Sequence, residues 1–329
     1  MDQYNAPPRR SILTSTRRTV ITASIGAALA APFARCARAA GGRTIRIGYQ
    51  RYGTLIILKH TGYLEQALAG AGDRVEWSEH PAGPQMLQAM GSGALDFGIT
   101  GDTPPIFAQA ASSRIVYVAH EPPAPQGEAI IVPKGSPITS LAGLKGKSVA
   151  LNRGSNVHWL LLRALQHAGL TSADINPVYL PPAAGRPAFD TGRVDAWAIW
   201  DPYLSSVEVG SSPRILATAQ GLVQNRQFLL ADRAFTTAHP DLVQETLRQL
   251  NRSDVWAGGH KENVAGYLAA DTGLPLDVVA RAIDRLSFGV SPMTPDVVAE
   301  QQQIADIFAA QHLIPAPLDV SKAVWHAAA

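Results

Sequence analysis

A pattern that occurs twice, 99 residues apart, restricts the possible folds of this 329-residue chain most strongly. Residues 93–105 (GALDFGITGDTPP) align without a gap with residues 192–202 (GRVDAWAIWDP). Each copy has a turn glycine, a short apolar strand and an Asp at which a proline-containing helix can begin. Upstream, Gly53-Thr54 and Gly154-Ser155 each follow a strand and precede an apolar helix. One α/β unit built twice predicts two facing lobes with a ligand between them.

The first 39 residues have the features of an export signal. Thr16-Arg17-Arg18-Thr19 is a twin-arginine pattern, and an uncharged, mostly small and apolar run follows over residues 20–31. Ala37-Arg38-Ala39 supplies an A-x-A-like cleavage site. The apolar run is shorter than the about 20 residues that a membrane-spanning helix needs. Residues 1–39 are therefore predicted to be a twin-arginine signal peptide, and the mature protein is predicted to be periplasmic.

Composition limits the function once this signal is set aside. The whole chain has a formal net charge of +2 at pH 7, but residues 1–39 hold six Arg and one Asp, which leaves the mature chain near −3. This balance argues against a nucleic-acid partner. The single cysteine, Cys36, leaves with the signal; its alternative use as a lipidation site is disfavoured by the preceding Arg35. The mature chain then has no disulfide, thiolate nucleophile or thiolate metal ligand.

Beyond residue 43, strands and helices alternate, which is typical of parallel strands with crossover helices. The first series predicts strands over 44–49, 75–79, 95–100 and 114–120, and helices over 55–69, 85–90 and 106–111. The second predicts strands over 128–132, 148–152, 178–180 and 194–200, and helices over 157–168 and 186–191. This series ends around 221–228. The remainder is predicted to be helical, with one helix beginning at Thr294-Pro295.

Two segments are predicted to connect the lobes. One is the crossing over residues 121–127, with three prolines and a glycine, and the other is the return of the chain near residue 225. Two connections favour a hinge that opens and closes over a freely moving linker. Lobe 1 is therefore predicted to comprise residues 40–124 plus 226–329, and lobe 2 residues 125–225. One continuous domain with a proline-rich loop is the alternative.

Four strand ends supply the candidate ligand-binding residues, because ligands of open α/β sheets collect beyond the carboxyl ends of the strands. Helix N-termini there offer unpaired N–H groups and a positive dipole end, which suits an anion. Taken singly, Thr54, Ser155, Asp102 and Asp201 could be plain helix caps, worth roughly 1 kcal/mol each; the repeat favours binding. Because a carboxylate repels an anion, the two Asp are expected to cap and orient their loops, or to meet a cationic end of the ligand.

Patterns of catalytic or metal-binding proteins are incomplete in this chain. Residues 143–148 (GLKGKS) end like a phosphate-binding loop but lack its leading glycine and precede a strand. Ser155 and His158 lie three apart on one predicted helix, yet no G-x-S-x-G elbow accompanies them. The nine His show no clustered ligand spacing. We therefore predict no enzymatic activity, no metal and no cofactor.

Six blocks in order resemble the periplasmic aliphatic sulfonate-binding proteins of ABC importers, over about residues 45–325. The blocks are 47–55 (IGYQRYGTL), 96–105 (DFGITGDTPP), 121–125 (EPPAP), 149–158 (VALNRGSNVH), 194–203 (VDAWAIWDPY) and 313–315 (LIP). The resemblance implies a two-lobed type II periplasmic binding protein, in which each lobe is a mixed, mainly parallel sheet flanked by helices and two hinge segments join the lobes. It also implies a monomer that closes on an alkanesulfonate and delivers it to the membrane permease for sulfur uptake.

The resemblance further implies a set of ligand-facing residues. One departure is Asp102, where such proteins often carry Glu, and the shorter side chain is expected to alter the size of the cleft. The implied ligand-facing residues are Gln50, Gly53, Thr54, Asp102, Thr103, Gly154, Ser155, Asn156, Trp200 and Asp201.

Two other functions stay open at this point. A sulfonate is ionised at any physiological pH and has three acceptor oxygens, so backbone N–H groups and hydroxyls can bind it. A receptor for taurine or another oxyanion, such as nitrate or a sulfate ester, would use the same site. Related folds also host hydrolases and thiamin-precursor synthases, but desulfinase-like enzymes use a cysteine nucleophile, which the mature chain lacks.

Overall fold

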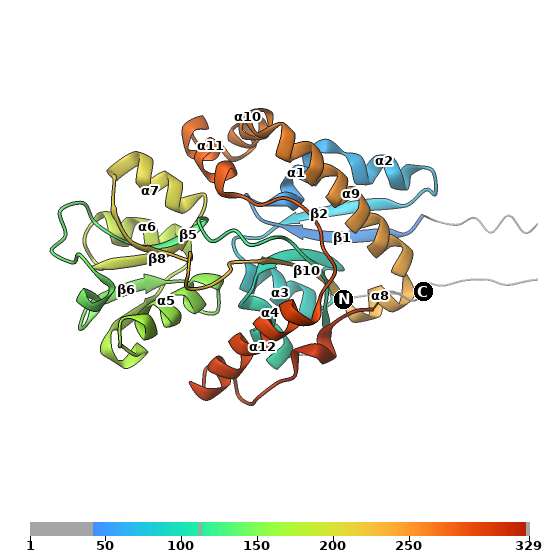
Figure 1. Cartoon of the computed structure of the whole chain (residues 1–329). Coiled ribbons are helices and arrows are strands. Elements are labelled where there is room, and N and C mark those ends of the chain that lie inside the picture. Colours follow the sequence, from blue (N-terminus) through green and yellow to red (C-terminus); the bar gives the residue numbers. More distant parts are fainter. Residues whose placement is uncertain (1–41, 112–113, 327–329) are drawn as a thin grey trace, which may run out of the picture. The chain divides into compact units, whose positions relative to one another are not determined.

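The computed structural model describes residues 42–111 and 114–326 (Figure 1). The chain divides into two units after residue 40, and the described residues belong to the second. The predicted signal peptide, with Cys36, lies outside them.

Two five-stranded sheets form the framework of the described unit. The first has the order β2-β1-β3-β10-β4 and the second β7-β6-β8-β5-β9. The first sheet contains β1 (Thr44–Tyr49), β2 (Arg74–Glu79), β3 (Phe97–Gly101), β4 (Ile115–His120) and β10 (Gln227–Asp232). The second contains β5 (Glu128–Val132), β6 (Ser148–Leu151), β7 (Asn176–Tyr179), β8 (Ala196–Trp200) and β9 (Arg214–Thr218).

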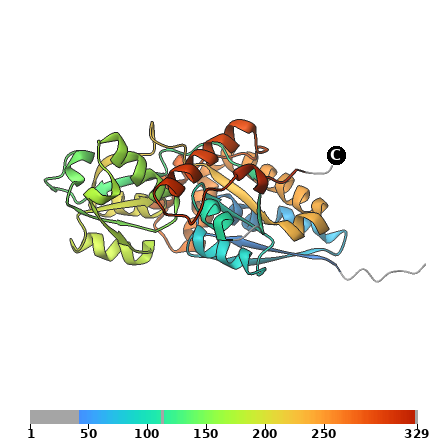
Figure 2. The ribbon, with the colours of Figure 1, turned by 90° about the horizontal axis from the view of Figure 1, so that it is seen from below.

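Helices accompany both sheets (Figures 1 and 2). Those that follow strands of the second sheet are α5 (Asn156–His167), α6 (Pro182–Asp190) and α7 (Tyr203–Ser211). The first sheet has α1 (Thr54–Thr61), α2 (Tyr63–Ala69), α3 (Gly83–Gly91) and α4 (Pro104–Ala111), and the C-terminal part of the chain adds α8 (Arg233–Ala238), α9 (Pro240–Gly259), α10 (Lys261–Thr272), α11 (Leu276–Arg285) and α12 (Pro295–Ala310). Short 3-10 turns lie at Leu141–Leu144, Ser172–Asp174 and Val320–Ala323.

The repeat seen in the sequence corresponds to the same local structure in both sheets. The two copies form β3 and β8, which pair in parallel with β1 and β6. The Asp that opens each copy fixes this pairing: Asp96 accepts the Arg46 N–H at 2.8 Å, and Asp195 accepts the Ser148 N–H at 2.8 Å. The central strands β3 and β5 are wholly buried, as their continuous apolar sequences require.

Each sheet also has one interior strand that runs antiparallel to both of its neighbours. β10 runs antiparallel between β3 and β4, and β5 runs antiparallel between β8 and β9. The alternation of strands and helices predicted parallel strands; β5 was predicted with its observed limits, whereas β9 and β10 were not predicted as strands. The sheets are therefore mixed, as the family resemblance implied, because each takes one strand from the chain just after it has crossed between the lobes.

The predicted helix over residues 55–69 is interrupted in the structure. It divides into α1 and α2 at Gly62, whose φ of 65° places it in the left-handed region. Glycine adopts this conformation without the steric cost that other residues have. The helix predicted to begin at Thr294-Pro295 is confirmed, since the Thr294 side chain accepts the Val297 N–H and α12 starts at Pro295.

Two segments connect the sheets and are bonded to each other. The segment between β4 and β5 and the segment between β9 and β10 lie side by side, and the Glu121 N–H donates to the Gln227 carbonyl at 2.9 Å. The Asn225 side chain donates to the Ala124 carbonyl at 2.8 Å. These are the two hinge segments that the sequence predicted. The strand sets lie on either side of the predicted lobe limits near residues 124 and 226.

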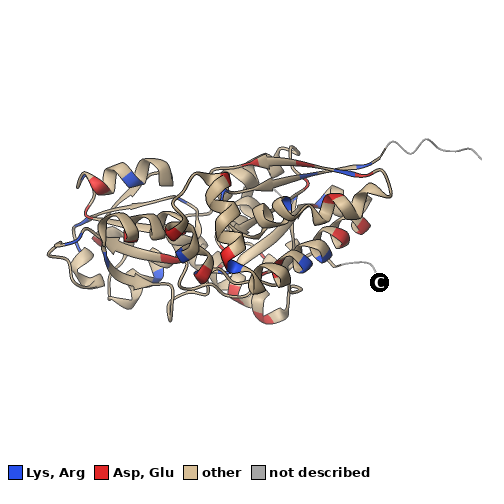
Figure 3. Cartoon of the chain, turned by 90° about the horizontal axis from the view of Figure 1, so that it is seen from above, with Lys and Arg blue, Asp and Glu red and all other residues tan. Residues whose placement is uncertain are grey.

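The C-terminal helices reach from the first lobe to the second. The ring of Phe308 on α12 stands edge-on to His158 of α5, with ring centroids 5.3 Å apart, and α11 contacts α7. Acidic and basic residues are interspersed over both lobes (Figure 3). Among the described residues, no helix has the length and apolar composition of a membrane span.

Candidate functional site

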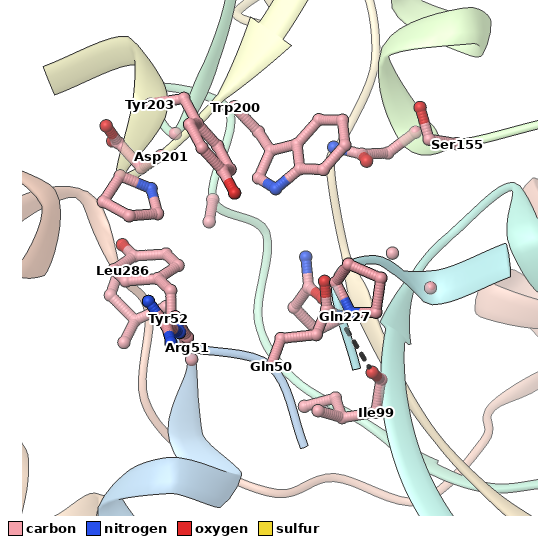
Figure 4. Close-up of a pocket in the computed structure, with 18 of the residues that line it drawn as sticks. Gln50, Arg51, Tyr52, Ile99, Ser155, Trp200, Asp201, Tyr203, Gln227 and Leu286 are labelled. Carbon is pink, nitrogen blue, oxygen red and sulfur yellow. Dashed lines mark hydrogen bonds between the residues drawn. The ribbon is translucent and has the colours of Figure 1, made fainter. Parts of the chain in front are cut away.

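A cavity of about 600 Å³ lies between the two sheets, at the carboxyl ends of their parallel strands (Figure 4). Its wall combines residues that follow β1 and β3 with residues that follow β6 and β8, as expected for open α/β sheets. The hinge segments and the end of α11 complete the wall. Of the ten residues predicted to face the ligand, six line this cavity, namely Gln50, Gly53, Ser155, Asn156, Trp200 and Asp201.

In the first lobe, α1 begins at the cavity without a side-chain cap. Its N-cap residue, Gly53, has a φ of 105°, a conformation that side-chain-bearing residues rarely adopt. The first helical residue, Thr54, is fully buried, and its hydroxyl donates to Glu121 instead of capping the helix. The N–H groups of this first turn therefore have no side-chain cap, and the turn begins directly after the lining residue Gly53.

In the second lobe, α5 begins at the same cavity and likewise has no side-chain cap. Ser155 occupies the N-cap position, but its hydroxyl donates back to the Asn152 carbonyl at 2.7 Å. The Asn156 side chain donates to Glu128 and, at 3.3 Å, to Asn225. Among the described residues, the structure shows no acceptor for the Asn156 backbone N–H. Helix dipole and unpaired N–H groups make this helix start a place for an anion.

A buried glutamate is hydrogen-bonded to the first residue of each of these two helices. Glu121 binds Thr54 of α1, and Glu128 binds Asn156 of α5. Burial raises the pKa of both carboxyls well above the ordinary range, and a second acid adds to the shift in each case, Asp254 for Glu121 and Asp102 for Glu128. Both glutamates are therefore favoured in the neutral form, which lessens repulsion of an anion in the cleft.

Asp201 links the two lobes at one end of the cavity. Its carboxylate accepts the Ser205 N–H at 2.9 Å and the Ser205 hydroxyl at 2.6 Å, and so fixes the start of α7. Arg285, at the end of α11, lies 3.5 Å from Asp201 and 2.8 Å from Glu208 on α7. Burial raises the pKa of Asp201, while Ser205 and Arg285 oppose that shift. As expected, this Asp orients its own loop.

The other four predicted residues do not line the cavity. Thr54 and Gly154 are each next in sequence to a lining residue, Gly53 and Ser155 respectively. Thr103 is fully buried and donates to Asp102 at 2.9 Å. Asp102 lines a separate cavity of about 300 Å³. Burial there raises the pKa of Asp102 to about 7. Their direct contact with a ligand stays a prediction.

Aromatic rings form part of the cavity wall (Figure 4). Trp200 and Tyr203 come from the end of β8 and the start of α7, with ring centroids 6.3 Å apart at 87°. Tyr52 faces them from the first lobe, where its hydroxyl donates to the Ala282 carbonyl at 2.6 Å. Trp200 also packs on the second lobe's core, so it is both a core aromatic and part of the cavity wall.

The hydrolase alternative finds no support in the geometry of its candidate residues. The Ser155 hydroxyl donates to Asn152, whereas His158 Nδ1 accepts the Gly154 N–H at 3.3 Å. Burial lowers the pKa of His158 to about 4. A nucleophile must lie within hydrogen-bonding reach of its base, and these two side chains are bonded to other groups. No cluster of metal-ligating side chains occurs among the described residues.

Sequence reasoning missed several residues of the cavity wall. Glu121 and Asn225 belong to the hinge segments, which we had treated as connections only, and Gln227 is the first residue of β10. Arg285 comes from α11, 84 residues beyond Asp201. One signal was available: Glu121 follows the apolar strand β4, and a carboxyl group in such a position needs a buried partner.

Comparison with known proteins gives the family that the sequence resemblance implied. The model of the NMT1/THI5-like family matches residues 56–264. A protein of Escherichia coli (strain K12) that carries the name of an aliphatic sulfonates-binding protein is 40% identical over 310 residues, which cover 94% of this chain and 97% of that one. The chain therefore belongs to the family of the aliphatic sulfonate-binding proteins, and it matches the NMT1/THI5-like family model. The relatives named here are binding proteins.

Two solved structures have the same fold over nearly the whole described unit. The alkanesulfonate-binding protein SsuA from Xanthomonas axonopodis pv. citri, bound to MOPS, superposes with a TM-score of 0.82 at 42% identity, over 86% of this chain and 98% of that one. The periplasmic aliphatic sulphonate binding protein SsuA from Escherichia coli gives 0.80 at 41% identity, over 87% and 93%. The fold is therefore that of the periplasmic binding proteins.

Proposed function

We propose that this protein captures organic sulfonates in the periplasm and delivers them to the permease of an ABC importer. The observation that carries the proposal is that α1 and α5, at equivalent positions of two lobes, both begin at one cavity without a side-chain cap. An anion between them would satisfy N–H groups from both lobes. It would thereby stabilise the arrangement in which the lobes are together, through its higher affinity for that state.

Of the six predicted residues that line the cavity, we expect some to bind the sulfonate headgroup and the others to contact the organic tail. Gly53, Ser155 and Asn156 surround the two helix starts, and Gln50 reaches the same part of the cavity, where its amide also donates to the Ile99 carbonyl at 3.4 Å. Trp200 and Asp201 lie on the side of the tail. Cavities of about 300–1,000 Å³ accommodate drug-sized ligands, so this one has room for tails much longer than ethyl.

Export completes the proposal. Residues 1–39 would act as a twin-arginine signal peptide, and the mature protein would work as a periplasmic monomer made of lobe 1 (40–124 plus 226–329) and lobe 2 (125–225). The predicted export agrees with the periplasmic relative. N-terminal sequencing of the protein recovered from a periplasmic extract tests it, and an intact residue 1 in that extract would contradict it.

Calorimetry with a graded set of anions tests the proposed ligand class. We expect binding of alkanesulfonates, with affinity rising from ethanesulfonate to longer tails by roughly 1 kcal/mol per methylene that contacts the aromatic wall. Nitrate and sulfate lack a tail and are expected to bind much more weakly. If no sulfonate bound, the assignment would be wrong.

A receptor for taurine is the second candidate, and Asp201 is the residue that favours it. Of the two predicted acids, only Asp201 lines the cavity and could meet an ammonium group. Its carboxylate is already bound by Ser205 and Arg285, which favours an uncharged tail. Asp201→Asn should weaken ethanesulfonate and taurine equally under the first proposal; a selective loss of taurine would support the second.

A further inference from the structure

The structure places a buried carboxyl group, that of Glu121, in the wall of the proposed sulfonate cavity, next to the start of α1. Only 1% of Glu121 is exposed. Its Oε1 accepts the hydrogen bond from the Thr54 hydroxyl, and the described residues offer no partner for Oε2. A carboxylate in such a place would face an anionic ligand at short range, whereas a carboxylic acid would present a donor to it.

The charged groups around Glu121 do not compensate a negative charge. Asp254, on α9, is a second buried carboxyl beside it. The arginines that line the cavity are paired elsewhere, Arg285 with Asp201 and Glu208, Arg51 with Glu79, and Arg186 with Asp190. The His120 ring bonds to the backbone carbonyl of Glu121, and burial lowers its pKa, which keeps it neutral.

From this geometry we propose that Glu121 binds the sulfonate as a neutral carboxylic acid, with its proton on the oxygen that faces the cavity, so that ligand affinity depends on pH. The inference rests on the proposed function. It also gives a reason for selectivity, because a strong-acid anion has acceptor oxygens and no proton of its own. Burial and the nearby Asp254 both raise the pKa of Glu121, which agrees with a protonated group.

The pH dependence of binding follows from the protonated fraction. A ligand that binds only the acid form has its apparent affinity reduced by the fraction of protein in that form. Above the pKa of Glu121 the dissociation constant should therefore rise up to tenfold per pH unit. Binding should take up close to one proton in this range. The sulfonate itself contributes no titration, because it stays ionised throughout.

The test is calorimetry of an alkanesulfonate at a series of pH values from about 5 to about 9, in buffers of different ionisation enthalpy. Wild-type protein should lose affinity and take up a proton as the pH rises. Glu121→Gln keeps the shape and a donor but cannot ionise, so it should bind as wild type does at low pH and show no pH dependence. Binding of wild type with a pH profile identical to that of Glu121→Gln would overturn the inference while leaving the proposed function intact.

Two further variants separate this role from others. Glu128→Gln alters the equivalent glutamate, which does not line the cavity, and should retain the wild-type pH dependence. Loss of the dependence in this variant would assign the proton to Glu128.

Thr54→Val removes the hydroxyl that favours the ionised form of Glu121, so it should move the midpoint of the profile to higher pH. If Glu121→Gln fails to fold, an unmoved midpoint in Thr54→Val contradicts the inference by itself. A large gain in affinity in Glu121→Gln at pH 7 would show that Glu121 is ionised there.

Discussion

The two lobes have the same strand order, yet the equivalent acids Asp102 and Asp201 have different environments. Asp201 lies in the cavity between the lobes and is bound by Ser205 of its own lobe and Arg285 of the other. Asp102 lies in a separate cavity, hydrogen-bonded to Thr103. The same strand end occurs in both lobes, but the role of its Asp depends on contacts with the C-terminal helices. These helices have no counterpart in the second lobe. A repeat therefore predicts where a site lies better than it predicts what each residue does there.

The substitution Asp102→Asn should give the largest effect in this comparison, and the quantity that it should change is the stability of the protein. Burial raises the pKa of Asp102 to about 7 in the folded protein, above its value in the unfolded chain. The folded state therefore holds the proton more tightly. The contribution of Asp102 to stability is fully present below about pH 4 and is lost as the pH rises toward 7. Relative to Asp102→Asn, the wild-type free energy of unfolding should fall by up to a few kcal/mol over this window.

Denaturant unfolding at several pH values measures this difference. Ligand affinity at one pH should change little, because Asp102 does not line the cavity. If Asp102→Asn instead removed sulfonate binding and left the pH dependence of stability as in wild type, the assigned difference between the two acids would be incorrect.

Proline at position 156 tests whether the second lobe binds through a backbone N–H group. Proline is tolerated at the first helical position, and Ser155 before it is extended, with φ −93° and ψ 171°, as a residue preceding proline must be. Asn156→Ala removes the side chain only, so the two variants differ mainly in the amide hydrogen. A hydrogen bond to a charged group is worth about 1.5–3 kcal/mol, so Asn156→Pro should bind roughly 10- to 150-fold more weakly than Asn156→Ala.

Thr54→Pro against Thr54→Ala is the same experiment in the first lobe. If the anion is shared equally, the two proline effects should be similar. A loss in one lobe only would show that the lobes differ in headgroup binding as they do in their acids.

Methionine at position 285 should have a smaller effect, about tenfold on ligand affinity, because Arg285 joins α11 of one lobe to α7 of the other. Arg281→Met is the matched control. Arg281 lies 4.0 Å from Glu208 and is half exposed, and such pairs contribute little. Calorimetry with one alkanesulfonate compares the two variants. Equal losses would indicate that the Arg285 contacts do not stabilise the joined arrangement of the lobes.

The sequence was sufficient for the parts of the fold that depend on local patterns. The strand at Thr44–Tyr49 was predicted with its observed limits, and both copies of the repeat gave buried strands at the site. β9 was missed although it follows α7 within the second lobe. β10 was missed because it enters the first sheet from the far lobe, antiparallel to its neighbours and with no helix between β9 and β10. The periodicity that identifies a βαβ unit is therefore absent there.

The residues of the site were also predicted only in part. Residues at strand ends or shortly after them, such as Gln50, Ser155 and Trp200, do line the cavity. Glu121 and Arg285 were missed because their roles depend on contacts between distant segments, with Thr54 across 67 residues and with Asp201 across 84. Thr54 looked like a helix cap, and only the structure shows its hydroxyl bound to Glu121 instead.

A crystal structure of the protein with an alkanesulfonate is the most direct test of the account. We expect the three sulfonate oxygens to accept hydrogen bonds from N–H groups at the starts of both α1 and α5, with the tail against Trp200 and Tyr203. A sulfonate bound outside this cavity, or held by side-chain cations while those N–H groups bind other parts of the chain, would contradict it.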